Sequence, residues 1–497
     1  MSVFERVRAA GLIAVIFVLF IQRGPAAEAW HVTAGGCPVS VIETPMPENC
    51  LPVPERHPYH YASFVCENKT EVTVEGLKLS TPMTFRLKPG SHRVIDPAGR
   101  HGALVIAANP LDRAAPKPDD PNVRYFGPGH HHVETLELKS GETLYLAEGA
   151  WLEACVVGKG ENITVAGPGV LSGACWKHRH GPNGRGLDDF NREGRLVLLS
   201  GRNIIVRDVT IYSSFGWTLV LKDVDGACVD NVKILGGRVI NDDGIDICSS
   251  RNVTIRNSFV RTQDDAIAPK WWCEDLVVTN CTVWSDDANN FRIGFECDPC
   301  GKGYGMRRQR YVDLDLRYPS AVIREPHQYW AHNFIHLQAV NEQRFEDIVF
   351  ENIRVPHAQP GDVLFNARTQ KVVPEDGISA ESCFSERAGT IDGVVLKNFS
   401  IAVDGFRSGV ERWTGRGKEL RKEAFAGDSS GLAVYLEAMD DAHPIRNVRF
   451  ENIPCVGPVT TSGAVEPIRG LNKTKTLNSL DMRWTFGAHE PYTMYRR

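Results

Sequence analysis

Three aspartates in two short acidic segments are the residues of this chain best suited to do chemistry. Asp243 lies in Asn-Asp-Asp-Gly (241–244), and Asp264 and Asp265 lie in Gln-Asp-Asp-Ala (263–266). Hydrolysis of a glycosidic bond needs a carboxylic acid to protonate the leaving oxygen, and an inverting enzyme also needs a carboxylate to activate water. Crowded carboxylates cannot all ionise easily, so one of them has a raised pKa and can act as the acid. The two segments therefore predict a centre for acid/base hydrolysis.

The spacing of these segments indicates which elements must position them. Asp264 follows Asp243 by 21 residues, and the stretch between them alternates apolar and polar residues around turn residues, as strands do. Such a spacing is close to one rung of a parallel β-solenoid, in which neighbouring strands lie roughly 4.8 Å apart. Turn residues followed by alternating apolar residues recur at Asn231, Asn252 and Asp275, which are 21 and then 23 residues apart. We therefore predict an all-β parallel β-helix that brings the three carboxylates together.

Composition shifts divide the chain into four expected segments. They are a signal peptide (1–29), a small β-sandwich-like domain (30–135), a β-helix catalytic domain (136–470) and a C-terminal tail (471–497). The first segment resembles an export signal, because two arginines precede an apolar run and a small-x-small site. We therefore expect an exported protein, in the periplasm, outside the cell or at its surface, with no membrane contact after cleavage.

Charge and cysteine content narrow the range of partners. The net charge of −5 over 497 residues gives no reason to expect nucleic acid as a partner. The thirteen cysteines cannot all pair within the chain, and the single C-x-x-C at 297–300 is weak evidence for zinc. His130, His131 and His132 are interpreted as a solvated loop. We expect no metal and no cofactor, and the sequence does not indicate an oligomeric state.

The acidic segments also resemble a known family. Asn-Asp-Asp-Gly-Ile-Asp-Ile (241–247) and the following Asp pair are similar to the signature of glycoside hydrolase family 28, the polygalacturonase-like family, whose first motif is usually Asn-Thr-Asp. The segment 215–219, which contains Trp217, resembles the family's aromatic segment one rung before the active site. The resemblance implies a right-handed parallel β-helix that hydrolyses O-glycosidic bonds of a plant or algal polysaccharide, or its oligosaccharides, with inversion. It also implies that Asp264 is the general acid, and that Asp243 and Asp265 orient the attacking water.

Two motifs of that family are changed, and both concern the substrate. Asn289 stands where the family has the histidine of Gly-His-Gly, and the Arg-x-Lys that grips a galacturonate carboxylate is missing from the expected window at 318–324. Arginine and lysine that pair with a carboxylate determine specificity, so the substrate is pectin-like or a related glycan. The expected substrate-binding residues are Asn241, Lys270, Asn289, Arg292 and Trp217, with Arg324 as a further basic candidate. Loop histidines at 327, 332 and 336 are candidates to replace the missing histidine.

Two other functions and one other class of substrate remain open at this point. A β-helical polysaccharide lyase would remove a proton beside a uronate carboxylate, often with calcium, and would leave an unsaturated product. A carbohydrate-binding solenoid without catalysis would bind glycan and release nothing. A neutral glucan is a further possible substrate, because dextran- and pullulan-cleaving relatives of the family also join a β-sandwich to such a helix.

Overall fold

The computed structural model describes most of the chain from Trp30 to Phe486, and every element in it is a β-strand. The described ranges are 30–44, 59–76, 79–97, 102–178, 194–239, 241–286, 288–295, 305–317, 333–358, 362–374, 387–403, 411–414, 421–424, 432–454, 456–466, 468–470, 474–476 and 483–486. Within these ranges no helix is long and apolar enough to cross a membrane. The expected signal peptide and most of the expected C-terminal tail lie outside the described residues.

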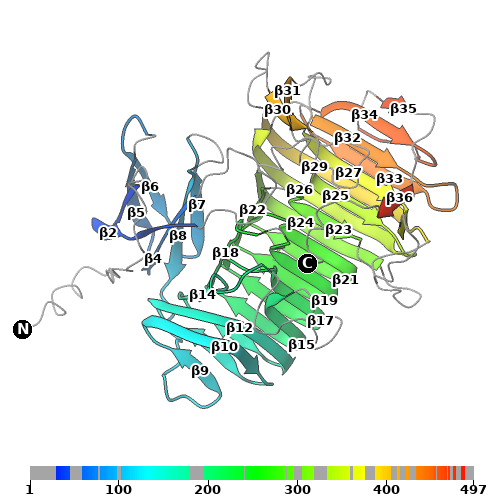
Figure 1. Cartoon of the computed structure of the whole chain (residues 1–497). Helices are drawn as coiled ribbons and strands as arrows, with labels where there is room; N and C mark the ends of the chain where they lie inside the picture. The colour runs from blue at the N-terminus through cyan, green and yellow to red at the C-terminus, as the bar shows by residue number, and fades with distance from the viewer. Residues whose placement is uncertain are drawn as a thin grey trace, which may run out of the picture.

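Eight N-terminal strands form two four-stranded sheets, drawn in blue in Figure 1. They are β1 (His31–Ala34), β2 (Cys37–Val39), β3 (Val41–Glu43), β4 (His60–Cys66), β5 (Thr70–Glu75), β6 (Met83–Leu87), β7 (Ser91–Ile95) and β8 (Leu104–Pro110). One sheet has the order β2-β1-β5-β6 and the other has the order β3-β4-β8-β7. Val72 and Val74 of the first sheet share one apolar core with Leu104 and Ile106 of the second. The two sheets therefore pack face to face as a small sandwich.

Twenty-four further strands stack into one continuous parallel solenoid, which runs from cyan through green to orange in Figure 1. They are β9 (Val123–Phe126), β10 (Gly129–Leu138), β11 (Thr143–Leu146), β12 (Ala150–Glu161), β13 (Thr164–Ala166), β14 (Val170–Ser172), β15 (Arg195–Arg207), β16 (Thr210–Tyr212), β17 (Trp217–Asp230), β18 (Lys233–Leu235), β19 (Ile245–Arg256), β20 (Phe259–Thr262), β21 (Ile267–Thr279), β22 (Thr282–Ser285), β23 (Phe291–Gly294), β24 (Gly305–Arg317), β25 (Asn333–Ala339), β26 (Arg344–Ala358), β27 (Val363–Thr369), β29 (Thr390–Val403), β32 (Leu432–Glu437), β33 (Ile445–Glu451), β34 (Val456–Ser462) and β35 (Thr474–Thr476). Two small two-stranded sheets complete the described strands: β28 (Lys371–Pro374) with β36 (Arg483–Phe486), and β30 (Glu411–Thr414) with β31 (Arg421–Ala424).

Asparagine ladders mark the turns between solenoid strands, as the repeated turn residues predict. Asn203 has a positive φ of 54° and donates from Nδ2 to Oδ1 of Asn162 one rung below, at 3.1 Å. Asn280 and Asn257 repeat this pattern at 2.8 Å. Asparagine tolerates the left-handed conformation, and its side-chain amide forms a hydrogen bond with the equivalent asparagine of the neighbouring rung. Each rung thus needs an Asn or Asp at its corner, while the alternating apolar residues fill one core along the solenoid.

The repeat spacing taken from Asn231 and Asn252 needs a correction. Val253 pairs with Ala227, and Asp230 pairs with Arg256, which places Asn231 beside Asn257 rather than beside Asn252. A rung here turns at two corners, as at Asn252 and Asn257, and the sequence pattern joined one corner to the other. The next step is right, because Val253 pairs with Leu276.

The sandwich packs against the side of the solenoid, next to the segment between β18 and β19 that contains Asp243. Tyr59 Oη donates to the carbonyl of Gly236 at 3.2 Å, and Lys233 Nζ donates to Asn109 Oδ1 at 2.7 Å. The Arg261 guanidinium lies over the Tyr59 ring at 3.9 Å. The interface between the sandwich and the solenoid therefore combines ring contacts, hydrogen bonds and charged groups. This combination favours a fixed arrangement of the sandwich on the solenoid.

The predicted fold, a parallel β-helix preceded by a small sandwich, is confirmed. The expected border at 135 falls inside β10, and the first strand of the solenoid begins at Val123. His130, His131 and His132 lie in that same strand, so the expectation of a solvated loop for them is wrong.

Candidate active site

Parallel strand pairing brings the three aspartates together. Asp243 precedes β19, and Asp264 and Asp265 precede β21, the next strand of the same sheet. The Gly244 N–H donates to the carbonyl of Asp265 at 2.9 Å, which fixes one turn directly above the other. A Cβ at Gly244 would lie 2.4 Å from the carbonyl oxygen of Ala266, so this close approach requires glycine. One carboxylate oxygen from each of the three aspartates lies within 4.8 Å of one oxygen from each of the other two.

The three carboxyl groups have different surroundings. Burial, with the neighbouring charges of Asp243 and Asp265, raises the pKa of Asp264 well above its ordinary value. Asp265 accepts from the Asn289 side chain at 2.7 Å and lies 3.6 Å from the Arg292 guanidinium. Asp243 lies 2.8 Å from the Lys270 ammonium group. Of the three, Asp264 has a raised pKa that favours a bound proton, while Asp243 and Asp265 face cations and hydrogen-bond donors.

Lys270 lies beneath the aspartates rather than on the open surface. Its ammonium group forms ion pairs with Asp243 at 2.8 Å and with Asp246 at 3.0 Å, and its side chain is 2% exposed. It also lies over the Trp217 ring at 3.5 Å, and the Arg195 guanidinium covers the same ring at 3.7 Å. Lys270 and Trp217 were both expected to bind substrate. The structure places them beneath the three aspartates, in a cluster of charged side chains around the Trp217 ring. Asp246 and Arg195 were missed by the sequence reasoning.

Asp242 is a third residue that the sequence reasoning missed, although it adjoins Asp243. Its carboxyl group is fully buried and accepts from the backbone N–H groups of Gly237 and Gln263, both at 2.6 Å. It also accepts from the N–H of Asp264 at 3.2 Å. Burial raises the pKa of Asp242 to about 8, against the lowering effect of these donors. Asp242 thereby holds the backbone that carries Asp264.

The position of the missing family histidine is filled by an amide network. Asn289 donates to Asp265 and accepts at Oδ1 from the Asn333 side chain at 2.8 Å. Arg292 pairs in register with His336 of β25, which is fully buried in a strand rather than placed in a loop. Burial and the charge of Arg292 lower the pKa of His336 well below its usual value, so this imidazole is neutral. The Asn241 amide faces Asp264 at 3.4 Å. All eight predicted site residues therefore lie in one region.

Several weaker candidates cannot be placed. Arg324, His327 and His332 lie outside the described residues. Among the described residues, two groups have ligand atoms close enough to hold a metal ion: the three aspartates, and a second group formed by His132, Glu153 and Cys175.

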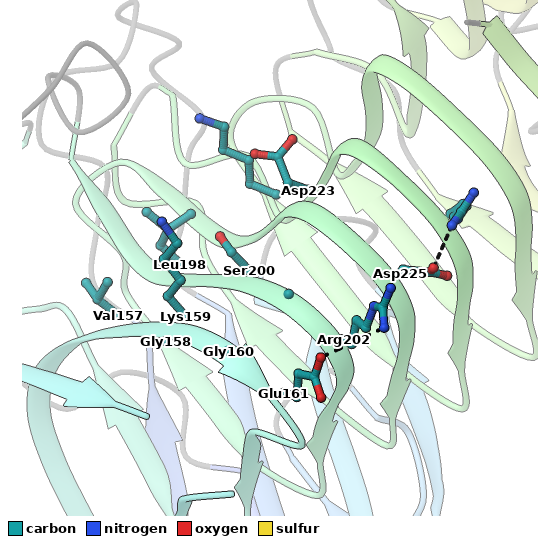
Figure 2. A pocket seen from close by; sticks show the side chains of 13 residues that line it. Val157, Gly158, Lys159, Gly160, Glu161, Leu198, Ser200, Arg202, Asp223 and Asp225 are labelled. Carbon is teal, nitrogen blue, oxygen red and sulfur yellow. Dashed lines mark hydrogen bonds and ion pairs between the residues drawn. The ribbon is translucent and has the colours of Figure 1, made fainter. Parts of the chain in front are cut away.

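A groove of about 690 Å³ lies along the outer face of the neighbouring rungs (Figure 2). Its wall carries two ion pairs, Glu161 with Arg202 at 3.9 Å and Asp225 with Arg251 at 2.7 Å. Leu198 lines this groove and also packs in one apolar cluster with Trp217. None of the three aspartates lines this groove.

Comparison with known proteins agrees with this geometry. Residues 139–285, which include all three aspartates, match the model of glycosyl hydrolases family 28. A polygalacturonase of Juniperus ashei is 26% identical over 135 residues, which are 27% of this chain and a quarter (25%) of that protein. The segment that holds the aspartates is therefore family 28-like.

A solved structure shows the same fold over nearly the whole chain. Dex49A from Penicillium minioluteum superposes with a TM-score of 0.51 at 13% identity, covering 95% of this chain and 94% of that one. A family 28 exopolygalacturonase of Yersinia enterocolitica gives a TM-score of 0.42 at 12% identity, covering 91% of this chain and 92% of its own.

Proposed function

We propose that this protein is an exported glycoside hydrolase that cleaves O-glycosidic bonds of a plant or algal polysaccharide, pectin-like or related. One observation carries the proposal: three carboxyl groups each bring an oxygen within 4.8 Å of the other two, and the environment of one of them favours its protonated form. Asp264 protonates the leaving oxygen, and Asp243 and Asp265 hold the water that attacks the anomeric carbon. The family 28-like segment supports the assignment, and the arginines near the N-terminus with the apolar run that follows support export.

The proposed stereochemical course is inversion. A separation near 5 Å usually accompanies retention, and inverting enzymes have about 6.5–9.5 Å between acid and base. Here the water is held by two carboxylates together, rather than placed across from a single base. The anomer of the first product, followed by proton NMR, tests this. Inversion is expected, and a retained anomer would mean that Asp243 or Asp265 attacks the sugar directly.

The substrate is identified by a screen of the purified protein against pectic, algal and glucan polysaccharides, with release of reducing ends measured. At least one polymer should be cleaved by the wild type and not by Asp264→Asn. Unsaturated products and loss of activity on chelation would instead indicate a lyase. The structure disfavours that reaction, because the Lys270 ammonium group is paired with two carboxylates. Glycan binding without release of reducing ends would indicate a solenoid that only binds.

Asp242→Asn should lower kcat about 10-fold to 100-fold and leave KM nearly unchanged. The amide cannot accept from all three backbone donors, so the turn that carries Asp264 shifts, and small misplacements are costly in this way. The variant should also change how stability depends on pH. In the wild type the folded state keeps the Asp242 proton up to about pH 8, while the unfolded chain releases it near pH 4. The stability contributed by this group therefore falls as the pH rises from about 4 to about 8.

Urea unfolding of both proteins at several pH values, together with steady-state kinetics, checks this prediction. The difference in free energy of unfolding should shift in favour of Asp242→Asn as the pH rises through that window. A variant with the wild-type kcat would show that Asp242 has no part in positioning Asp264.

A further inference from the structure

Three side chains on successive rungs meet at the N-terminal end of the solenoid, away from the aspartates. His132 of β10 pairs in register with Glu153 of β12, and Glu153 pairs with Ser172 of β14. Cys175 follows in the turn after β14. Parallel stacking therefore places an imidazole, a carboxylate and a thiol on one side of the molecule.

The ligand atoms of these side chains are close and partly accessible. His132 Nδ1 lies 3.3 Å from Glu153 Oε2, and one atom each of His132, Glu153 and Cys175 lies within 4.8 Å of the other two. His132 and Cys175 are exposed, whereas Glu153 is largely covered. An ion can therefore reach the group from solvent without any movement of the strands.

The three groups form a ligand set typical of zinc. Zinc binds imidazole nitrogen and carboxylate oxygen at about 2.0–2.2 Å and thiolate at about 2.3 Å, and it accepts three protein ligands with water as the fourth. The ligand atoms in such a tetrahedron lie roughly 3.3–3.8 Å apart, so only small side-chain rotations are needed here. One carboxylate and one thiolate would also balance the charge of a divalent ion.

The surroundings restrict how these ligands can rotate. The His132 ring lies beside Trp176, with ring centres 6.1 Å apart. His130 Nε2 lies 3.7 Å from Glu153 Oε1, and its ring stacks on Trp151. Partners of this kind orient metal ligands in known sites. Thiolate is the form of cysteine that binds a metal, so the ion must displace the proton of the Cys175 thiol on binding.

We propose that His132, Glu153 and Cys175 form a binding site for zinc or a chemically similar divalent ion, with water in the fourth position. The ion links β10, β12 and the turn after β14, and so stabilises the first rungs of the solenoid. The site is independent of the proposed hydrolysis, since none of the three residues contacts the aspartates. The sequence analysis expected no metal, and this proposal departs from that expectation.

Cobalt titration of the full chain tests the site, after treatment with a chelator and dialysis. Cobalt bound to a thiolate gives a charge-transfer absorption band that carboxylate or imidazole ligands do not give. We expect this band to saturate at one ion per chain, and zinc to displace the cobalt. Cys175→Ser should abolish the band. His132→Ala should weaken cobalt binding by at least about 100-fold, which is more than is typical when a residue that only supports a metal ligand is replaced.

Matched controls locate the site. Cys228→Ser removes a thiol elsewhere on the solenoid, and His131→Ala removes the neighbouring imidazole, whose Nε2 contacts the Gly127 carbonyl at 2.8 Å. Both variants should keep the band. Asp264→Asn should keep it too, which separates this site from the three aspartates.

A second measurement does not depend on the variants. Zinc should protect Cys175, and not Cys228, from alkylation detected by mass spectrometry. Absence of the band in the wild type, or a band that survives in Cys175→Ser, would overturn the proposal. A disulfide between Cys175 and the neighbouring Cys155 in the purified protein would overturn it as well.

Discussion

Replacing Asp264 by asparagine should lower kcat/KM for polysaccharide hydrolysis by about 10²–10⁴-fold, the usual contribution of general acid catalysis. Asparagine has nearly the same shape as the protonated carboxyl group and cannot give a proton to the leaving oxygen. Release of reducing ends under steady-state conditions measures the loss. The melting temperature should stay close to that of the wild type, because a neutral group replaces a group whose pKa is already raised.

The pH dependence separates a lost acid from a damaged fold. In the wild type, kcat/KM should fall as the pH rises through the raised pKa of Asp264, because only the protonated form donates. Asp264→Asn should lack this basic limb in its residual activity. Asp275→Asn is a suitable control, since Asp275 is a half-buried residue at a corner within β21, paired with Arg308 at 2.7 Å. Its activity should stay within about twofold of wild type, as is usual for surface substitutions.

Lys270→Met should cost about 3–5 kcal/mol of unfolding free energy and abolish most activity. Removal of this buried cation leaves Asp243 and Asp246 without the partner that both contact, and breaking a buried ion pair is costly in this way. Asp243 would then bind a proton and no longer activate water. Urea denaturation measures the first effect, and release of reducing ends at a temperature where the variant is folded measures the second.

Lys233→Met provides the matched control for that variant. Lys233 is also fully buried, but its ammonium group donates to Asn109 Oδ1 and to the carbonyls of Asp208 and Asn231, each at 2.7 Å. The control should lose stability and keep its kcat. If Lys233→Met and Lys270→Met lost activity in parallel, the effect would come from instability rather than from the charge beside Asp243.

The three aspartates could be found from the sequence because each stands directly before a strand of one repeat. Their supporting groups could not. Strand alternation indicates that Lys270 points away from the core, but not that it lies over the Trp217 ring, which the Arg195 guanidinium also contacts. Likewise, Asp242 and Asp243 are neighbours of the same type. Only the folded turn shows that Asp242 binds backbone N–H groups while Asp243 joins the carboxylate group.

The type of repeat, a parallel β-helix, could be predicted from the sequence, but the register between its rungs was harder to predict. Asn231, Asn252 and Asn257 all have positive φ values, because each turns a corner of the solenoid. A pattern of corner residues therefore predicts the β-helix, but not which corners lie on the same side. The same gap concealed the His132 group, whose members are far apart in sequence and are joined only by parallel register.

The most direct test of Asp264 as the acid compares two leaving groups on the same sugar. The sugar is the one that the polysaccharide screen identifies, once in its natural linkage and once as a nitrophenyl glycoside, whose phenolate leaves without a proton. Asp264→Asn should lose far less kcat/KM on the nitrophenyl substrate than on the natural one, whereas Asp243→Asn should lose both alike. Equal losses on the two substrates for Asp264→Asn would contradict the assignment of Asp264 as the proton donor.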